Sequence, residues 1–296
     1  MLTYFQAIIL GLLQGVTELF PISSLGHSVI FAWLFNWNGI LSSQSQAESF
    51  FLSFLVALHV ACGLALFIFY RSTWWRIIKG FFASIKIGKA DATDTRLAWL
   101  LIAATIPAGL FAVIFEHKLR TQFAKPLSAI IFLFINGCIL LIGDHYQKTH
   151  GETSKTGDLA ATRMNVSRKL NLPRAIIIGI AQIGALFAGI SRSGITMVSG
   201  LFSGLNHEDS ARFSFLLATP IIFGAGIYKL PDFFSNLDAG LRGEILAGSV
   251  VAGIAAYFSV RFLDKYFQDK TLRPFGIYCI AASLAMLLVG LVRGHF

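Results

Sequence analysis

Charged side chains are scarce in this sequence. Asp, Glu, Lys and Arg make up 13% of the 296 residues, whereas hydrophobic residues make up 55%. A soluble protein carries roughly a quarter charged residues to cover its surface, so the composition excludes an ordinary soluble protein and a disordered one. Cysteine is scarce too. Cys62, Cys138 and Cys279 each lie inside an apolar run, which favours packing residues over disulfides or metal ligands. The class that remains is a polytopic membrane protein.

Long apolar runs fill most of the chain. Six of them reach the roughly 20 residues that a helix needs to cross a bilayer core of about 30 Å. Two further apolar segments, 4–36 and 173–206, are interrupted by Gly, Ser and ionisable residues, and the first also by Pro21. Non-helical backbone at membrane depth is tolerated only inside protein or along a cavity, so each segment predicts a re-entrant helical hairpin. We therefore expect an all-α polytopic membrane protein with two such hairpins and six transmembrane helices, at 50–70, 97–116, 126–144, 212–230, 244–263 and 274–292.

The Lys and Arg residues gather in three segments that this scheme places on one side of the membrane. Segments 71–96, 145–174 and 261–273 hold 16 of them, against six on the opposite side. Because basic loops stay in the cytoplasm, both termini are expected outside. The net charge of +9 is then explained by basic loops on the cytoplasmic side and by contact with lipid, and no nucleic acid is expected as a partner. Aromatic and basic residues interleave within 71–96, which predicts a helix lying in the membrane interface.

The chain contains an internal repeat. Residues 7–28 align with 175–196 at a constant offset of 168, with eight of 22 positions identical, and 53–63 resembles 214–224. Each half holds one hairpin and three spans, and because three is odd the halves must insert with opposite orientation. Inverted repeats with broken helices that meet near the midplane are the layout of many secondary transporters. The repeat divides one integral membrane domain into a first repeat at 1–144, a polar cytoplasmic linker at 145–172 and a second, inverted repeat at 173–296.

Few ionisable residues lie at membrane depth, and each is therefore a candidate for function. Glu18 and His27 lie in the first hairpin, and Arg192 lies at the matching turn of the second. A guanidinium, hydroxyls and the N–H groups of a turn that opens a helix suit a phosphate. A carboxylate, an imidazole and hydroxyls beside it suit phosphoryl transfer. The uncharged polar neighbours in the two hairpins are Gln14, Thr17, Ser23, Ser24, Ser191, Ser193 and Thr196.

Three functions fit this set from spacing alone. In a phosphate-handling enzyme, Ser24 or His27 would be the nucleophile or would position water. Glu18 would be a base, an orienter of His27 or a ligand for Mg²⁺ or Ca²⁺. In an ion or anion transporter, the same turns would bind the cargo. In a purely structural role, Glu18 and Arg192 would pair to hold the two repeats together.

The other ionisable residues have expected roles in packing. His59 lies alone in an apolar span and is expected to be packed or hydrogen-bonded. Arg212 is expected to pair with Glu208, four residues earlier, and Asn206 or Asp209 to cap the next helix. Four acidic residues at span ends are expected at the membrane interface: Glu48, Glu116, Asp144 and Asp264.

Two sequence motifs carry a resemblance to a known family. QGVTELFPISSLGH at 14–27 and AGISRSGIT at 188–196 are similar to the two signature motifs of the bacterial undecaprenyl-diphosphate phosphatases, also called bacitracin resistance proteins. The sequence departs from the family pattern at Gln14, the less acidic variant of that position, and at Ala188, which replaces a proline. The resemblance implies Gln14 and Glu18 as a polar pair, Ser24 and His27 at the reaction centre, and Ser191, Arg192, Ser193 and Thr196 as a phosphate-binding loop.

The resemblance also implies an activity. The expected reaction is hydrolysis of a C55 isoprenyl diphosphate to the monophosphate and inorganic phosphate at the outer face of the bacterial plasma membrane. This reaction recycles the lipid carrier of peptidoglycan synthesis and confers bacitracin resistance. The implied cofactor is Mg²⁺ or Ca²⁺ at Glu18, weakened by Gln14, and the implied partners are the lipid substrate and membrane lipids, with a homodimer left open. The alternative is a lipid-phosphate flippase or anion transporter on the same inverted repeat.

Overall fold

The computed structural model describes six stretches of the chain: residues 2–37, 50–87, 93–123, 125–150, 165–229 and 242–294. Throughout these stretches the secondary structure is helical, with no strand. Glu48, the side chain of Glu116 and residues 151–164 of the expected linker lie outside the part that the structure describes. The helices and their bounds are α1 (Tyr4–Thr17), α2 (Ser24–Leu34), α4 (Phe50–Phe69), α5 (Arg71–Ile87), α6 (Thr93–Phe123), α7 (Pro126–His150), α9 (Leu172–Ala181), the 3₁₀ turn η1 (Gln182–Leu186), α10 (Arg192–Phe202), α11 (His207–Tyr228), α13 (Arg242–Asp269) and α14 (Arg273–Val292).

Five helices are long and apolar enough to cross a membrane: α6, α7, α11, α13 and α14. They coincide with five of the six predicted spans. The sixth prediction, 50–70, is α4, which joins α5 through a bend of 86°. A turn of this size after Phe69 fits the expectation that the following segment lies along the interface, because Trp75, Phe82 and Ile85 are exposed on α5 among basic residues.

The first predicted hairpin segment contains two short helical pieces and the second contains three. Residues 4–36 hold α1 and α2, and residues 173–206 hold most of α9, then η1 and α10. None of these pieces has more than 14 residues, so none reaches the roughly 20 that a span requires. In the first segment Pro21 follows the end of α1, and α2 begins at the N-cap Ser23.

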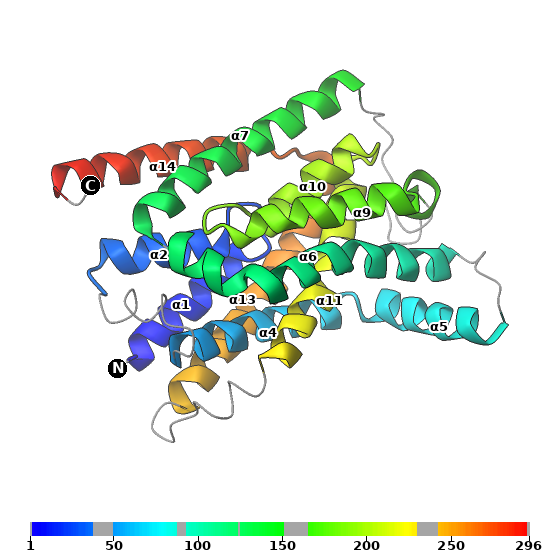
Figure 1. Ribbon diagram of the computed structural model, residues 1–296, viewed down its shortest axis with the longest axis horizontal. Helices are drawn as coiled ribbons and strands as arrows, with labels where there is room; N and C mark the ends of the chain where they lie inside the picture. The colour runs from blue at the N-terminus through cyan, green and yellow to red at the C-terminus, as the bar shows by residue number, and fades with distance from the viewer. Residues whose placement is uncertain are drawn as a thin grey trace.

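Glycines bring the short helices close to long ones. A side chain on Gly11 of α1 would overlap the backbone of Gly248 on α13, and one on Gly179 of α9 would overlap the backbone of Ala104 on α6. These close approaches pack α1 against α13 and α9 against α6. Figure 1 shows both termini at the same end of the bundle.

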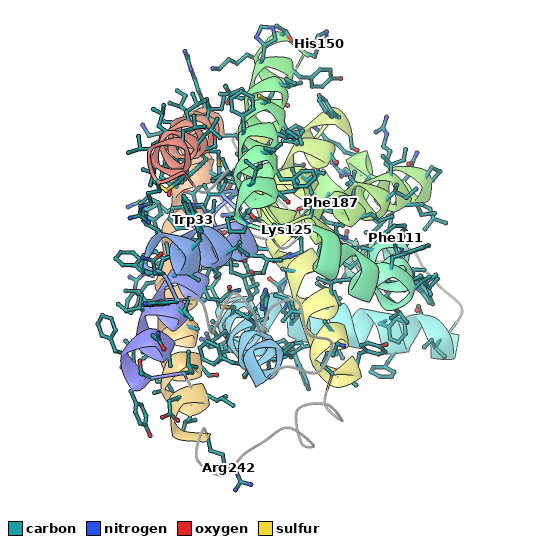
Figure 2. All side chains as sticks on the ribbon, turned by 60° about the vertical axis from the view of Figure 1, so that its left-hand side comes forward. Trp33, Phe111, Lys125, His150, Phe187 and Arg242 are labelled. Carbon is teal, nitrogen blue, oxygen red and sulfur yellow. The ribbon has the colours of Figure 1, made fainter. Side chains whose placement is uncertain are left out.

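Apolar side chains cover much of the outer surface of the bundle. Ile114, Leu246 and Val292 are 69%, 67% and 88% exposed. In Figure 2, side chains project outward all around the bundle, with His150 at the top of the view and Arg242 at the bottom. A surface of this kind suits lipid, and polar groups are concentrated inside.

Candidate active site

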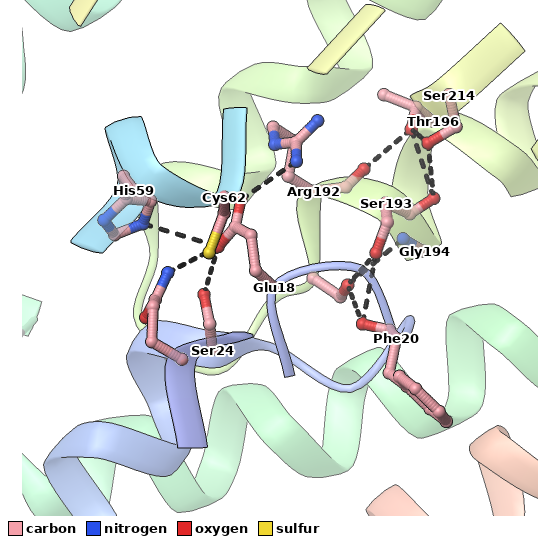
Figure 3. A network of polar contacts seen from close by, with 12 residues as sticks. Glu18, Phe20, Ser24, His59, Cys62, Arg192, Ser193, Gly194, Thr196 and Ser214 are labelled. Carbon is pink, nitrogen blue, oxygen red and sulfur yellow. Dashed lines mark hydrogen bonds and ion pairs between the residues drawn. The ribbon is translucent and has the colours of Figure 1, made fainter. Parts of the chain in front are cut away.

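Glu18 lies at the centre of a buried polar cluster, directly after α1 (Figure 3). Its Oε2 accepts hydrogen bonds from Gln14 Nε2 at 2.9 Å and from Ser24 Oγ at 2.6 Å. Its Oε1 accepts one from Arg192 Nη2 at 2.9 Å. The carboxylate side chain is 5% exposed and that of Arg192 is 15% exposed. The structure thus brings together Glu18, Gln14, Ser24 and Arg192, which the sequence placed in two different hairpins.

The turn before α2 is held in an unusual backbone conformation. Ser23 has a φ of 72°, a backbone angle that residues other than glycine rarely adopt. Its Oγ accepts hydrogen bonds from the backbone N–H of Gly26 and from that of Gly189, both at 3.2 Å. The first bond caps α2, and the second ties this turn to the second broken segment.

The second turn is built from hydroxyl side chains. Ser191 caps α10 by accepting from the backbone N–H of Gly194 at 3.1 Å, and its Oγ lies 3.0 Å from the Oγ of Ser193. Ser193 in turn donates to the carbonyl of Phe20 in the first turn at 3.2 Å. Thr196 bonds to Ser214 on α11 at 2.6 Å. Ser191, Ser193 and Thr196 therefore fix the shape of the turn and leave Arg192 pointing toward Glu18 (Figure 3).

One side chain of α7 spans both turns. Asn136 is fully buried; its Nδ2 donates to the carbonyl of Pro21 at 3.0 Å and its Oδ1 accepts from the backbone N–H of Ser191 at 2.9 Å. A buried carboxamide with both ends paired is a specific spacer. Asn136 sets the distance between the two turns.

Two helix N-termini open at this cluster, α2 after Ser23 and α10 after Ser191. The N-terminal turn of a helix carries free N–H groups and a partial positive charge. Together with Arg192, these termini make the region favourable for an anion.

Hydrogen-bonding capacity is left over at the centre of the cluster. Nη1 of Arg192 and Oε1 of Gln14 are buried and have no hydrogen-bond partner among the described residues. A buried polar atom without a partner is costly and calls for an explanation. A bound phosphate would satisfy the guanidinium, and a cation would satisfy the amide oxygen.

His27 is directed elsewhere. Its Nδ1 lies 2.8 Å from the carbonyl of Ser23 and its Nε2 lies 2.8 Å from the hydroxyl of Tyr278 on α14. Because a carbonyl only accepts, Nδ1 carries the proton and Nε2 accepts from Tyr278. Both ring nitrogens therefore hold the turn in place, and within the described residues neither is bonded to Glu18.

Three residues of the region were not among the predicted site residues; the predicted hydrogen bonding of His59 is confirmed, by a contact of 2.8 Å between its Nδ1 and the carbonyl oxygen of Leu55. His59 on α4, expected to be packed or hydrogen-bonded, places Nε2 3.4 Å from Glu18 Oε2. Asn136 and Tyr278 join the turns from α7 and α14. An asparagine inside an apolar span was the signal available for Asn136, since polar side chains at membrane depth are rare.

The site offers few ligands for a metal ion. Within the stretches described, no three His, Cys, Asp or Glu side chains are grouped so that they could hold one. Mg²⁺, however, is commonly bound by one or two carboxylates together with substrate phosphates. Glu18 supplies one carboxylate and Gln14 Oε1 is unpaired among the described residues, so a cation held here would take its remaining oxygens from the substrate.

A second group of buried charges lies outside this cluster. Arg212 contacts Glu208 at 2.6 Å through Nη1, and it contacts Asp264 Oδ1 at 2.9 Å through Nε. Tyr70 donates to the same Asp264 oxygen at 2.9 Å. The predicted pairing of Arg212 with Glu208 is confirmed, as is the cap, where Asn206 accepts from the N–H of the residue three positions on at 2.7 Å.

Asp144, expected at the interfacial end of a span, lies six residues before the end of α7 and is buried and paired. Lys148 contacts its Oδ2 at 2.8 Å and His207 Nε2 lies 3.4 Å from its Oδ1. These contacts join the end of α7 to the start of α11.

Comparison with known proteins identifies the family. A family model described as "Bacitracin resistance protein BacA" matches residues 7–285. The chain is 45% identical to the "Undecaprenyl-diphosphatase" of Mycolicibacterium paratuberculosis, covering 97% of each chain. It is 42% identical to "Undecaprenyl-diphosphatase 2" of Frankia alni, over 94% of this chain and 95% of the relative. It is 41% identical to "Undecaprenyl-diphosphatase 2" of Burkholderia ambifaria, over 95% and 94%. The motifs around Glu18 and Arg192 thus lie in a full-length match, and the chain belongs to the bacitracin resistance protein BacA family of undecaprenyl-diphosphatases.

Proposed function

We propose that this chain is an integral membrane phosphatase that hydrolyses undecaprenyl diphosphate to undecaprenyl phosphate and inorganic phosphate. The observation that carries the proposal is the hydrogen bond from Ser24 Oγ to Glu18 Oε2, on a carboxylate that Arg192 holds through its other oxygen. A hydroxyl bonded to a base, beside a cation, is the arrangement of an activated nucleophile. The relatives' activity agrees with that chemistry.

Arg192 binds the diphosphate. Its Nη2 is used by Glu18, while Nη1 is buried and has no partner among the described residues. A guanidinium can hold a carboxylate and a phosphate oxygen at the same time through separate N–H groups. The N-terminal turns of α2 and α10 add further positive potential for the anionic head group.

Ser24 is the nucleophile and Glu18 its base. Ser24 Oγ attacks the terminal phosphorus and its proton passes to Glu18 Oε2. The bond from that phosphorus to the bridging oxygen breaks, and undecaprenyl phosphate leaves. Water then attacks that phosphorus and the bond to Ser24 Oγ breaks. One proton of the water passes to Ser24 Oγ, inorganic phosphate is released, and the proton held by Glu18 leaves for solvent. His27 keeps the turn in position through the carbonyl of Ser23.

A divalent cation, Mg²⁺ or Ca²⁺, belongs to this proposal. Glu18 and Gln14 Oε1 would hold it together with diphosphate oxygens. When bound, the cation neutralises phosphate charge.

The proposed architecture is an inverted repeat whose two broken segments are re-entrant and whose site opens to the outer side. Equivalent features of the two halves of the structure are separated by the same number of residues as the sequence repeat, which supports this architecture. Gly11 and Gly179, which make equivalent close contacts, are separated by 179 − 11 = 168 residues, the offset of the repeat. The helices α2 and α10 begin 192 − 24 = 168 residues apart. The 16 to 6 distribution of basic residues supports the orientation.

A homodimer remains a prediction of the sequence. It is checked by measuring the mass of the purified protein in detergent with light scattering. A single chain mass at all protein concentrations would exclude it.

Phosphate release from a long-chain prenyl diphosphate by the purified protein tests the activity, with and without divalent cations. We expect release by the wild type and its loss in Arg192→Ala and Glu18→Gln. Unchanged turnover in either variant would refute the assignment. Transport of undecaprenyl phosphate across liposome membranes without hydrolysis would favour the flippase alternative.

A further inference from the structure

Helix α5 has three distinct faces along its length. At 3.6 residues per turn, Trp75, Phe82 and Ile85 fall within about 80° of one another, and these side chains are 61%, 59% and 62% exposed. Arg76 and Lys79 are exposed too, and they fall within about 60° of each other on the neighbouring face. An apolar face and a cationic face are therefore both exposed, side by side on one helix, and the third face is turned toward the rest of the protein.

The third face of α5 packs on the first two turns of α6. Ile77 is buried there. Thr95 Oγ1 of α6 donates to the carbonyl of Gly80 at 3.0 Å, and Trp99 Nε1 donates to Ser84 Oγ at 3.3 Å. Because α6 is long and apolar enough to cross a membrane, its first two turns lie at one end of that span. Helix α5, bent by 86° from α4, therefore lies at the level of the lipid head groups.

The cations of α5 are not neutralised by acidic side chains. Residues 71–87 contain no Asp or Glu, and neither Arg76 nor Lys79 is paired with a carboxylate among the described residues. Lys79 Nζ lies 5.1 Å from the centroid of the Trp75 ring, so an ammonium and an aromatic ring meet where the cationic and apolar faces join. Such a surface is complementary to a lipid with an acidic head group, because the acyl chains contact the apolar face and the phosphate contacts the cations.

We propose that α5 is a docking surface for acidic phospholipids. Trp75, Phe82 and Ile85 enter the boundary of the acyl chains, and Arg76 and Lys79 bind phosphate oxygens of the head groups. A zwitterionic phospholipid offers the same chains, but its own ammonium group cancels the charge of its phosphate. Selectivity for the acidic head group is therefore the property that distinguishes this surface from an ordinary apolar contact with the bilayer. The inference is independent of the proposed phosphatase activity, since it concerns a helix outside the candidate active site.

Quenching of tryptophan fluorescence by brominated lipids tests the proposal on the full chain in detergent micelles. Brominated phosphatidylglycerol and brominated phosphatidylcholine are titrated in separate experiments. Because the chain has five tryptophans, the quenching at α5 is obtained as the difference between the protein with Trp75 and the Trp75→Phe variant. We expect phosphatidylglycerol to reach half-saturation at a concentration about tenfold lower than phosphatidylcholine, since each cation near an acidic lipid adds to the attraction. This preference should shrink as salt is added.

Variants of the two exposed faces should have different effects. Arg76→Gln and Lys79→Gln should each lower the preference for phosphatidylglycerol by about fivefold at low ionic strength, because each removes one cation from the head-group level. Phe82→Ala should weaken the binding of both lipids by the same factor, because both have the same acyl chains. The midpoint of thermal unfolding in detergent without added lipid is the control for folding, and it should equal that of the wild type since all three side chains are exposed.

Lys265→Gln and Lys270→Gln are the matched controls. Both lysines are exposed and lie on or directly after α13, each next to an aspartate in the chain, and each substitution changes the net charge as much as one on α5 does. We expect the preference for phosphatidylglycerol to stay within about twofold of the wild type in both controls. Equal half-saturation by the two lipids in the wild type would overturn the proposal. So would a loss of preference in the controls as large as in R76Q and K79Q, or a loss in F82A that is confined to phosphatidylglycerol.

Discussion

Two buried groups of charges can be compared in this molecule, and each contains an arginine. Arg212 is enclosed by two carboxylates, Glu208 and Asp264, and its side chain is 3% exposed. Arg192 contacts one carboxylate, Glu18, and its Nη1 has no partner among the described residues. The protein itself supplies two carboxylates to Arg212, whereas Arg192 keeps an N–H donor, Nη1, that can bind a ligand.

This difference separates a structural pairing from a site. A buried charge pair with every group satisfied holds helices in register, and removing one partner leaves an uncompensated charge. A cluster with unpaired buried donors and acceptors is tolerated because something else completes it.

The largest effect is expected for Arg192. Replacing Arg192 by Ala should lower kcat/KM for phosphate release on the order of 10³-fold or more, because the charge on the transferring phosphoryl group loses its cation. Arg192→Lys should recover little, since an ammonium cannot hold a carboxylate and a phosphate in one plane. The midpoint of thermal unfolding in detergent serves as the control for folding. Near-normal turnover in R192A would make Arg192 a structural residue like Arg212.

Ser24 and Glu18 should act as a unit. Glu18→Gln is expected to lower kcat by about 10²–10⁴-fold, because it removes the base. Ser24→Ala should lower it at least as far, and the double variant should be no slower than the slower single one. The measurement is kcat for all three variants. Additive losses would show that the two residues act in different steps.

Arg212 should affect stability and leave chemistry intact. Arg212→Ala leaves Glu208 and Asp264 buried without their cation, which should cost about 3–5 kcal/mol. The free energy of unfolding in detergent measures this, and kcat per folded molecule should stay within about twofold. A large loss of kcat without a loss of stability would contradict the distinction between the two groups.

The smallest effect is expected for Gln14. Gln14→Glu adds a second carboxylate beside Glu18, so the concentration of Mg²⁺ that gives half-maximal activity should fall by about tenfold, with kcat little changed at saturating Mg²⁺. Gln14→Leu removes the oxygen and serves as the opposite variant. Identical Mg²⁺ dependence in all three proteins would exclude Gln14 from the cation site.

Much of the site was accessible from the sequence because it lies in two local motifs. The offset of 168 residues aligned Ser24 with Arg192, and the structure does bring their turns together. Pro21 and the capping serines marked where the helices break. The five long spans followed from length and hydrophobicity alone.

The remainder depends on contacts between distant elements. Nothing local distinguishes His59 from a histidine packed inside a span, and its contact with Glu18 depends on which face of α4 meets the first broken segment. Tyr278 is likewise an ordinary aromatic residue of an apolar helix until α14 packs beside His27. The 86° bend between α4 and α5 occurs at Tyr70, where no proline or glycine signals it.

The separation of 174 residues between Glu18 and Arg192 has a consequence for biosynthesis. At translation rates of about 5–20 residues per second, the first half waits roughly 10–35 seconds before its arginine exists. During that interval Glu18 is accompanied by Gln14, Ser24 and His59, all of which are made in the first 59 residues. The nascent first half thus supplies polar partners for a carboxylate that enters the membrane, and Arg192 adds the cationic partner of Glu18 once the second half is made.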